Sequence, residues 1–462
     1  MTDVIQAPSD TPAIPVRLVR PAEAETAIAT LPAPLKAQAE LAKFTGKAGQ
    51  AAPLVGAGGV ELVLAGLGEG AAADAMALRA LPAKLTPGFY AFEPREDGPS
   101  ADLMTQAWAF GAYRFDRYKL KHGEPQARLI AGAGVDLASV HAISHACALA
   151  RDMINTPAND MGALQIETIA REVAEAFGAR ITVITGDNLL EANYPAIHAV
   201  GRAAVPHRAP RMIEISWGQA GHPLVAIVGK GVVFDTGGLD IKPSAGMRTM
   251  KKDMGGAAHA LALGRMVMAA KLPVRVAVLL PVAENAIAGD AMRPGDILAS
   301  RKGLSIEVGN TDAEGRLILA DALARAAELE PALTIDMATL TGAARVALGP
   351  DVPPFYTDDD GLAADIETAA RAVGDPVWRM PMWSGYESSI DSDIADLKND
   401  PDAWAQAGSI TAALFLKRFA PAGPWVHLDI FAWSARSRPG WPAGGEAQAI
   451  RALLQMLKAR YA

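Results

Sequence analysis

The chain has 462 residues, of which 50% are hydrophobic and 20% are charged, and its 43 basic and 51 acidic side chains give a formal net charge of −8. This length allows two or three domains, each able to bury a core, and the composition is ordinary for a globular protein. The acidic balance argues against a general affinity for nucleic acid, although it does not exclude a local basic patch.

Cysteine use and the first residues indicate the compartment. Cys147 is the only cysteine, so no disulfide can form within the chain, and a small buried side chain is its simplest interpretation. Residues 1–15 contain acidic residues and prolines but no basic-then-apolar signal peptide. No apolar run reaches the roughly 18 residues that a membrane helix needs. We therefore expect a cytoplasmic protein without membrane association.

The first part of the chain, residues 1–150, is predicted to be a smaller α/β domain. Val60–Ala65 is expected to be a strand that leads through a glycine-rich turn into a helix over Ala71–Leu81. Gly66, Gly68 and Ala71 have the spacing of a relaxed dinucleotide-binding fingerprint, but prolines interrupt the stretch that should supply its acidic partner. A tight strand-to-helix turn is therefore the better interpretation.

Two longer helices are predicted next. The aromatic residues of Leu103–Leu120 indicate a helix packed against a core, and Asp136–Met153 is expected to be a long helix that Asn155–Asn159 ends. We place a domain boundary near residue 150, in the second of these helices. Residues 151–462 are then a second, larger domain.

From Ala163 onward, helical and strand patterns alternate. Such alternation predicts an α/β fold with a mostly parallel sheet flanked by helices. The expected strands are Ile181–Ile184, Met212–Ile215, Leu224–Val228, Val274–Leu280, Ser305–Val308, Thr334–Met337 and Val426–Ile430.

Charged residues gather at the ends of apolar runs between Ile227 and Leu317. Leu224–Val228 reads as a buried strand because it is a short continuous apolar run between a proline and a glycine. Lys230 and Asp235 follow it directly. They would thus lie where an open α/β sheet binds its ligands, outside the carboxyl ends of the strands.

Three further carboxylates precede helices in the same stretch. Asp253 comes before a helical pattern over Ala257–Met268, and Asp312 and Glu314 come before one over Leu317–Ala327. Carboxylates at helix starts are favoured by the helix dipole and by the free N–H groups there. Together with Asp235 they form a set of four acids that would raise one another's pKa values if they converged without partners.

Two interpretations of this set remain open on the residues alone. Two divalent cations would balance four negative charges, and carboxylate clusters commonly hold paired metals roughly 3.5–4 Å apart. Alternatively, the acids could form a network of ion pairs with Lys230, Lys242 and Arg316, because buried charges are either paired or bound to metal.

A longer motif favours the metals. Asn310–Leu317 reads Asn-Thr-Asp-Ala-Glu-Gly-Arg-Leu, and this stretch is identical to the signature of the leucyl (cytosol) aminopeptidase family of di-metal exopeptidases, which the chain resembles from about Asn155 to its end. Supporting segments of the family stand in the expected order at Lys230, Phe234–Gly238, Ile241–Ser244, Lys251–Ala257, Asp336–Ala343, Ala407–Ala413 and Trp425–Ile430.

The resemblance implies a ligand set for two divalent ions per subunit. Lys230, Asp235, Asp253 and Glu314 would hold one ion, and Asp235, Asp312 and Glu314 would hold the other, so that two of the carboxylates bridge. Lys230 would bind as the neutral amine. Oxygen ligands without histidine leave the metal open among zinc, manganese, magnesium and cobalt.

The resemblance also implies roles around the metals. Lys242 would remain charged and stabilise the oxyanion, while Arg316 would hold a bicarbonate ion that relays a proton. The metals would produce a bridging hydroxide that attacks the first peptide bond. The residues implied to line the substrate cleft are Met250, Thr339, Leu340 and Gly342.

The chain is therefore expected to be a metal-dependent aminopeptidase that acts on short peptides, and the family's usual assembly implies a homohexamer. Two alternatives belong to other classes: a non-catalytic, regulatory role in DNA binding, and a two-metal hydrolase acting on phosphoesters or amides. One departure from the family concerns specificity. Phe431–Ser434 replaces residues that are usually small, so a preference for leucine is not expected to carry over.

Overall fold

The computed structural model describes residues 4–69, 71–119, 125–401 and 406–462. The chain divides into two compact units. The first consists of Met1–Ala148, Ala370–Asp375 and Ser434–Ala443, and the second of Leu149–Ala369, Pro376–Trp433 and Gly444–Ala462. Helices α6 (Leu137–Asn155) and α14 (Asp360–Val373) supply residues to both. The long helix expected over Asp136–Met153 is α6.

The first unit contains one sheet with the strand order β1-β6-β5-β2-β4-β3. Neighbouring strands are parallel except in the antiparallel pair of β3 and β4. The strands are β1 (Ile5–Gln6), β2 (Ile14–Val19), β3 (Ala51–Gly56), β4 (Gly59–Gly66), β5 (Gly88–Phe92) and β6 (Ala127–Ile130). The helices are α1 (Ala24–Ala29), α2 (Ala33–Leu41), α3 (Ala72–Ala77), α4 (Leu81–Lys84) and α5 (Ala101–Gly111).

The turn after β4 is structural, as expected. The carboxylate of Asp74 lies at the start of α3, where its Oδ2 accepts the backbone N–H of Ala71 at 3.4 Å. It also lies beneath Gly68, whose φ of +61° suits glycine. A carboxylate therefore occupies the helix N-terminus at which a dinucleotide would place its pyrophosphate.

The helix predicted over Leu103–Leu120 is too long. Helix α5 ends at Gly111, and the described residues that follow it, 112–119, are not helical. In a continuous helix Trp108 and Phe115 would lie on one face and Phe110 and Tyr113 on the opposite one, so the four aromatic residues do not form a single stripe. Leu120 itself lies outside the described residues.

The second unit is built on a larger sheet with the order β16-β15-β18-β14-β9-β11-β8-β7, and β10 adds to β11. Strands β18, β14, β9 and β11 run parallel in its centre, which confirms the predicted mostly parallel sheet. The strands are β7 (Arg180–Thr185), β8 (Arg211–Trp217), β9 (Leu224–Gly229), β10 (Gly231–Asp235), β11 (Arg275–Asn285), β14 (Leu333–Ala338), β15 (Pro354–Tyr356), β16 (Trp378–Arg379) and β18 (Trp425–Asp429).

One predicted strand has a different place. Ser305–Val308 corresponds to β13 (Ser305–Glu307), which pairs with β12 (Ile297–Ala299) and β17 (Leu397–Lys398) in a separate small sheet. Its residues alternate between buried and half-buried, whereas every residue of β9 is buried. A short strand that is covered less completely does not belong to the centre of a parallel sheet.

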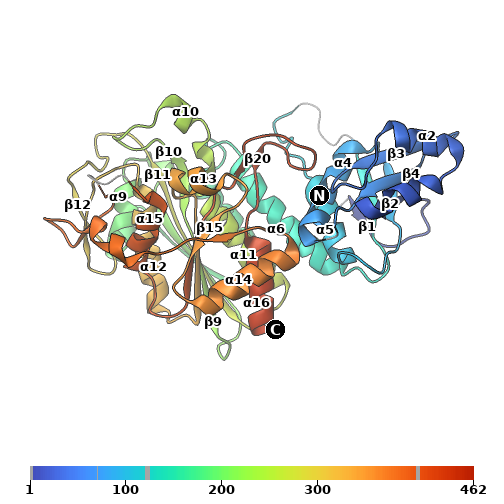
Figure 1. Cartoon of the computed structure of the whole chain (residues 1–462). Helices are drawn as coiled ribbons and strands as arrows, with labels where there is room; N and C mark the ends of the chain where they lie inside the picture. Colours follow the sequence, from blue (N-terminus) through green and yellow to red (C-terminus); the bar gives the residue numbers. More distant parts are fainter. Residues whose placement is uncertain (1–3, 70, 120–124, 402–405) are drawn as a thin grey trace. The chain divides into compact units, whose positions relative to one another are not determined.

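Helices cover both faces of the large sheet. Figure 1 shows α11 and α16 on one side and α9 and α12 on the other, and α11 packs on β9, β11 and β14 while α12 packs on β9 and β11. The apolar run of β9 follows from this arrangement, because alternate side chains need a partner on each face. The helices are α7 (Ala163–Ala176), α8 (Asn188–Glu191), α9 (Pro195–Gly201), α10 (Ser244–Met247), α11 (Gly255–Ala269), α12 (Glu314–Glu328), α13 (Gly342–Leu348), α15 (Gly408–Lys417) and α16 (Ile450–Tyr461). Among the described residues, none of the helices could cross a membrane.

Asp321 in α12 forms hydrogen bonds with the start of α9 and with Arg301, and its replacement is expected to destabilise the fold. This buried carboxylate accepts the backbone N–H groups of Ala196 and Ile197 at 2.9 and 3.1 Å, and that of Arg301 at 2.8 Å. Asp321→Ala leaves the two buried donors at the start of α9 and the half-buried N–H of Arg301 without this acceptor, so we expect the free energy of unfolding to fall by about 3 kcal/mol or more. Urea denaturation measures this change.

Asp321→Asn is the matched control for this prediction. It keeps one oxygen for the two donors at the start of α9, so its loss should be clearly smaller than that of Asp321→Ala. Equal urea midpoints for wild type and Asp321→Ala would show that the three hydrogen bonds contribute nothing to stability.

Candidate active site

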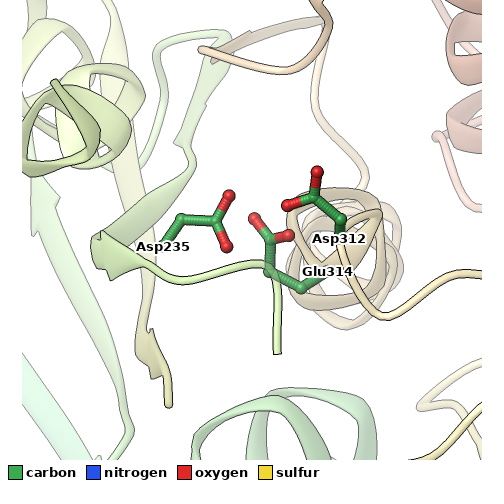
Figure 2. A group of neighbouring side chains, drawn as sticks. All are labelled: Asp235, Asp312 and Glu314. Carbon is green, nitrogen blue, oxygen red and sulfur yellow. The ribbon is translucent and has the colours of Figure 1, made fainter. Parts of the chain in front are cut away.

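The predicted carboxylates meet at the carboxyl ends of the central strands. Asp235 is the last residue of β10, Asp312 lies in the turn before α12, and Glu314 is the first residue of that helix. Figure 2 shows the three side chains pointing toward one another, and each offers an oxygen within 4.8 Å of the others. The predicted strands do not include β10, which follows β9 with only Lys230 between them and has one glycine, at its first position.

Lys230 connects the fourth carboxylate to this group. Its Nζ lies 2.6 Å from Oδ2 of Asp253 and 3.0 Å from Oε1 of Glu314, and it donates to the carbonyl oxygen of Thr339 at 3.1 Å. Asp253 belongs to the short 3-10 helix Met250–Met254 that leads into α11. All three charged side chains are buried. The structure therefore brings all four predicted acids into one cluster.

Lys242 lies on the other side of the cluster. Its Nζ is 2.7 Å from Oδ2 of Asp235 and also contacts Oδ1 of Asp312. Burial would lower the pKa of Lys242, but the two carboxylates raise it above its ordinary value. Lys242 thus keeps its charge and faces the same oxygens that surround the centre of the site.

The electrostatics of the cluster distinguish the two interpretations left open by the sequence. Burial, together with Asp235 and the other acids, raises the pKa of Glu314 to about 8, and burial with Asp235 raises that of Asp312 to about 6. Lys230 and Lys242 each pair with two carboxylates and Nζ of Lys252 lies 3.9 Å from Oδ1 of Asp253, yet this leaves four acids against three lysines. Ion pairs are therefore present but do not satisfy the acids, and the donor set fits divalent cations.

Two residues that hold this cluster were not singled out from the sequence. Asn285, the last residue of β11, donates from Nδ2 to Oδ1 of Asp235 at 2.8 Å and to the carbonyl oxygen of Thr311 at 3.1 Å. Strand β11 was expected to end at Leu280, so Asn285 had no assigned place. Its function depends on the pairing of β10 with β11, in which Asp235 and Asn285 are opposite each other.

The second overlooked residue is Asp429, at the end of β18. Its Oδ1 accepts the backbone N–H groups of Leu340 and Thr341 at 2.9 and 3.2 Å, and its Oδ2 accepts the hydroxyl of Thr341 at 2.6 Å. The hydroxyl of Thr339 in turn donates to Oδ1 of Asp253 at 2.9 Å. The segment from Thr339 to Gly342 is thereby fixed beside the acidic cluster, while Met250 is half-buried on the 3-10 helix that carries Asp253.

Arg316 presents an unused donor near the start of α12. Its side chain is buried and donates from one terminal nitrogen to the carbonyl oxygen of Asn399 at 2.6 Å. Its Nε is buried and has no acceptor in the part of the chain that the structure describes. A buried guanidinium N–H without an acceptor fits a small anion as its partner.

The comparisons with family models and with known proteins indicate the same family. Residues 148–454 match the model of the cytosol aminopeptidase family, catalytic domain, and residues 14–131 match that of the M17 aminopeptidase, N-terminal domain. A Roseiflexus castenholzii protein named probable cytosol aminopeptidase is 37% identical over 462 residues, covering 93% of this chain and 94% of that one.

Solved structures agree with the sequence relatives. The cytosol aminopeptidase of Coxiella burnetii is 40% identical with a TM-score of 0.93, and the match covers 99% of this chain and 100% of that one. The bottromycin maturation enzyme BotP, in a structure described as a complex with Mn, is 32% identical with a TM-score of 0.87, and the match covers 97% and 99%. The likeness thus extends over both units of the chain.

Proposed function

Because this chain belongs to the cytosol aminopeptidase family and is a metal-dependent aminopeptidase, we propose that it cleaves the first residue from short peptides with two divalent ions held by the acidic cluster. The observation that carries this proposal is the meeting of Asp235, Asp312 and Glu314 within 4.8 Å of one another. The pKa of Glu314, which burial and then the charge of Asp235 raise to about 8, supports this proposal, because a bound cation would stabilise the charged carboxylate.

The ligands divide into two sets that share two members. We assign Lys230, Asp235, Asp253 and Glu314 to one ion, and Asp235, Asp312 and Glu314 to the other. Support comes from the contacts of Lys230 with Asp253 and Glu314, which mark one side of the cluster, and from the position of Asp312 on the side of Lys242. Zinc or manganese best fits this proposal, with magnesium or cobalt as further options, and a relative binds Mn. When bound, the ions supply an activated water and polarise the peptide carbonyl.

The remaining chemistry belongs to the chain itself. Lys242 holds a positive charge beside Asp235 and Asp312, so its ammonium can donate to the carbonyl oxygen as negative charge develops there. Arg316 is assigned a small anion such as bicarbonate, which its free Nε can bind. Thr339, Leu340 and Gly342 are assigned to the substrate cleft together with Met250, because the segment that Asp429 fixes lies against Asp253.

The ligand assignment predicts how many ions each variant binds. Asp253→Asn should retain about one ion per chain, and Asp312→Asn should also retain about one, because each of these carboxylates serves a single ion. Wild type should retain two. Metal content is measured by mass spectrometry after dialysis with manganese. Asp240→Asn is the control, because Asp240 accepts the backbone N–H of Thr311 nearby and is outside the ligand set.

A result of two bound ions in either ligand variant would contradict the assignment. A wild type that binds one ion would contradict the paired site itself.

We also propose the domain organisation, the location and the assembly of the protein. We assign residues 1–150 to an N-terminal domain and 151–462 to the catalytic domain, and we expect a cytoplasmic homohexamer. The names of the relatives support the location. The alternative roles in DNA binding and in phosphoester hydrolysis are not favoured, since the family match covers residues 148–454 and the relatives are aminopeptidases.

A further inference from the structure

A hollow of about 460 Å³ lies at the end of the large sheet formed by β7 and β8. Its lining comes from these two strands, from the segment between α8 and α9, and from Arg301 and Arg325. This volume is within the range of about 300–1,000 Å³ that is typical of sites for small molecules. Arg325 and Glu314 belong to the same helix, α12, and lie about three turns, or about 16 Å, apart along it. The hollow is therefore separate from the acidic cluster.

Positive charge exceeds negative charge around the hollow. Its lining contains three arginines and one carboxylate, Glu214. Glu328 pairs with Arg301 and Arg325 and reduces the excess to one positive charge, which remains with Arg180. The chain as a whole has a formal net charge of −8, so the local excess is opposite in sign to that of the protein. A hollow of this kind attracts anions.

The lining also has hydrogen-bond donors that the protein does not use. Among the described residues, one guanidinium and three hydroxyl groups of the lining have neither a hydrogen bond nor an ion pair; they belong to Arg180, Thr182, Tyr194 and Ser216. Arg325 donates one N–H from each of its terminal nitrogens, so that each keeps a second one. Both oxygens of Glu214, in contrast, already accept from Arg325. A ligand with several acceptor oxygens would match this surplus of donors.

Two of the arginines are held in place by the protein itself. Nε and Nη2 of Arg325 donate to the two oxygens of Glu214 at 2.9 and 3.2 Å. Arg301 donates from Nη1 to the carbonyl oxygen of Ala192 at 2.8 Å, and its guanidinium carbon lies 4.3 Å from the centroid of the Tyr194 ring. Side chains that are already ordered lose little further entropy when a ligand binds.

We propose that this hollow binds a small dianion with several oxygen atoms, such as a phosphate ester or a dicarboxylate. Arg180 supplies a charge-assisted hydrogen bond to the anion, and the hydroxyl groups of Thr182, Tyr194 and Ser216 supply neutral ones. Structural ion pairs account for Arg301 and Arg325 without any ligand, so the decisive residue is Arg180. The proposal does not depend on the proposed aminopeptidase reaction, because no residue of the lining belongs to the acidic cluster.

The test measures the binding of sodium sulfate and of sodium succinate to the manganese-loaded full chain by isothermal titration calorimetry. Sulfate represents the tetrahedral group of a phosphate ester, and succinate represents a dicarboxylate. We expect at least one of them to bind, with an affinity that falls as sodium chloride is added. Arg180→Gln should weaken this binding by about tenfold or more, because it removes a charged donor. Thr182→Val keeps the shape of the side chain and removes only a hydroxyl, so it should weaken binding by less.

Arg171→Gln is the matched control. It removes an exposed arginine of α7 that is outside the hollow, so binding should stay as in wild type. Any binding of the same anions at Arg316 should be equal in all of these variants, and only the component that depends on Arg180 counts.

The proposal is wrong if neither anion binds, or if Arg180→Gln and wild type bind both anions equally. Arg180 is exposed, so its replacement should not prevent folding. Dependence on Arg180 for sulfate alone would identify phosphate esters as the ligand class, and dependence for succinate alone would identify dicarboxylates.

Discussion

Replacing Glu314 by glutamine is expected to lower kcat/KM by at least about a thousandfold and to reduce the number of bound ions below two per chain. Glu314 is one of the two carboxylates shared by both proposed ions, and it lies near Asp235 and contacts Lys230 in the cluster. The amide keeps the shape of the side chain but supplies neither charge nor a second anionic oxygen. A thousandfold loss corresponds to about 4 kcal/mol of transition-state stabilisation, which is within the range expected for losing metal chemistry.

The pH dependence of protein stability tests the same substitution independently of activity. In metal-free protein the pKa of Glu314 is about 8, against an ordinary value of 4.5, because burial and Asp235 disfavour its charge. The folded protein therefore keeps a proton that the unfolded chain has released. It follows that the free energy of unfolding of metal-free wild type falls as pH rises from about 4.5 to about 8. This part of the decline should be absent in Glu314→Gln, which has no proton to lose at this position.

Glu328→Gln, at the other end of α12, is the control for both the activity and the stability measurements. Glu328 is more exposed and pairs with Arg301 and Arg325, so its replacement should leave the bound ions and kcat/KM nearly unchanged. Full activity of Glu314→Gln with two bound ions would contradict the assignment of Glu314. A decline in stability with pH that is equal in wild type and Glu314→Gln would show that Glu314 does not carry the unfavourable charge.

The parts of the site that lie in short motifs could be predicted from the sequence. Asp312 and Glu314 are neighbours in one turn, and Lys230 follows an apolar run whose burial on both faces can be read from its composition. Their local patterns depend on few distant contacts. The positions of these side chains at one edge of the sheet then follow from the parallel arrangement of the strands.

Residues whose function depends on distant pairing could not be predicted in the same way. Asn285 reaches Asp235 only because β10 pairs with β11 in a particular register. Asp429 fixes Leu340 because β14 and β18 are neighbours. Phe431 could be recognised as a departure from the family, but nothing local in the sequence indicates that its ring lies near Lys252 and Arg345.

Replacing Lys242 by methionine is expected to lower kcat by about a hundredfold or more while the protein still binds two ions. In the proposed function the ammonium of Lys242 donates to the carbonyl oxygen as charge develops, and removing one donor of this kind typically lowers kcat by about 10²–10³-fold. KM should change little, because the interaction forms mainly in the transition state. Steady-state kinetics with alanyl-p-nitroanilide and metal analysis of the same sample measure both quantities.

Lys242→Met also distinguishes a catalytic role of Lys242 from a role in a purely structural ion pair. Lys242 contacts Asp235 and Asp312, so a structural role would consist of neutralising these two carboxylates. Removing such a cation would leave the acids freer to bind metal, and kcat of the loaded enzyme would then be unchanged. Lys271→Met, at a lysine outside the cluster, controls for the general loss of a positive charge. A fall in kcat with two ions bound would assign Lys242 to the transition state, whereas unchanged kcat with tighter metal binding would assign it to the ion pairs alone.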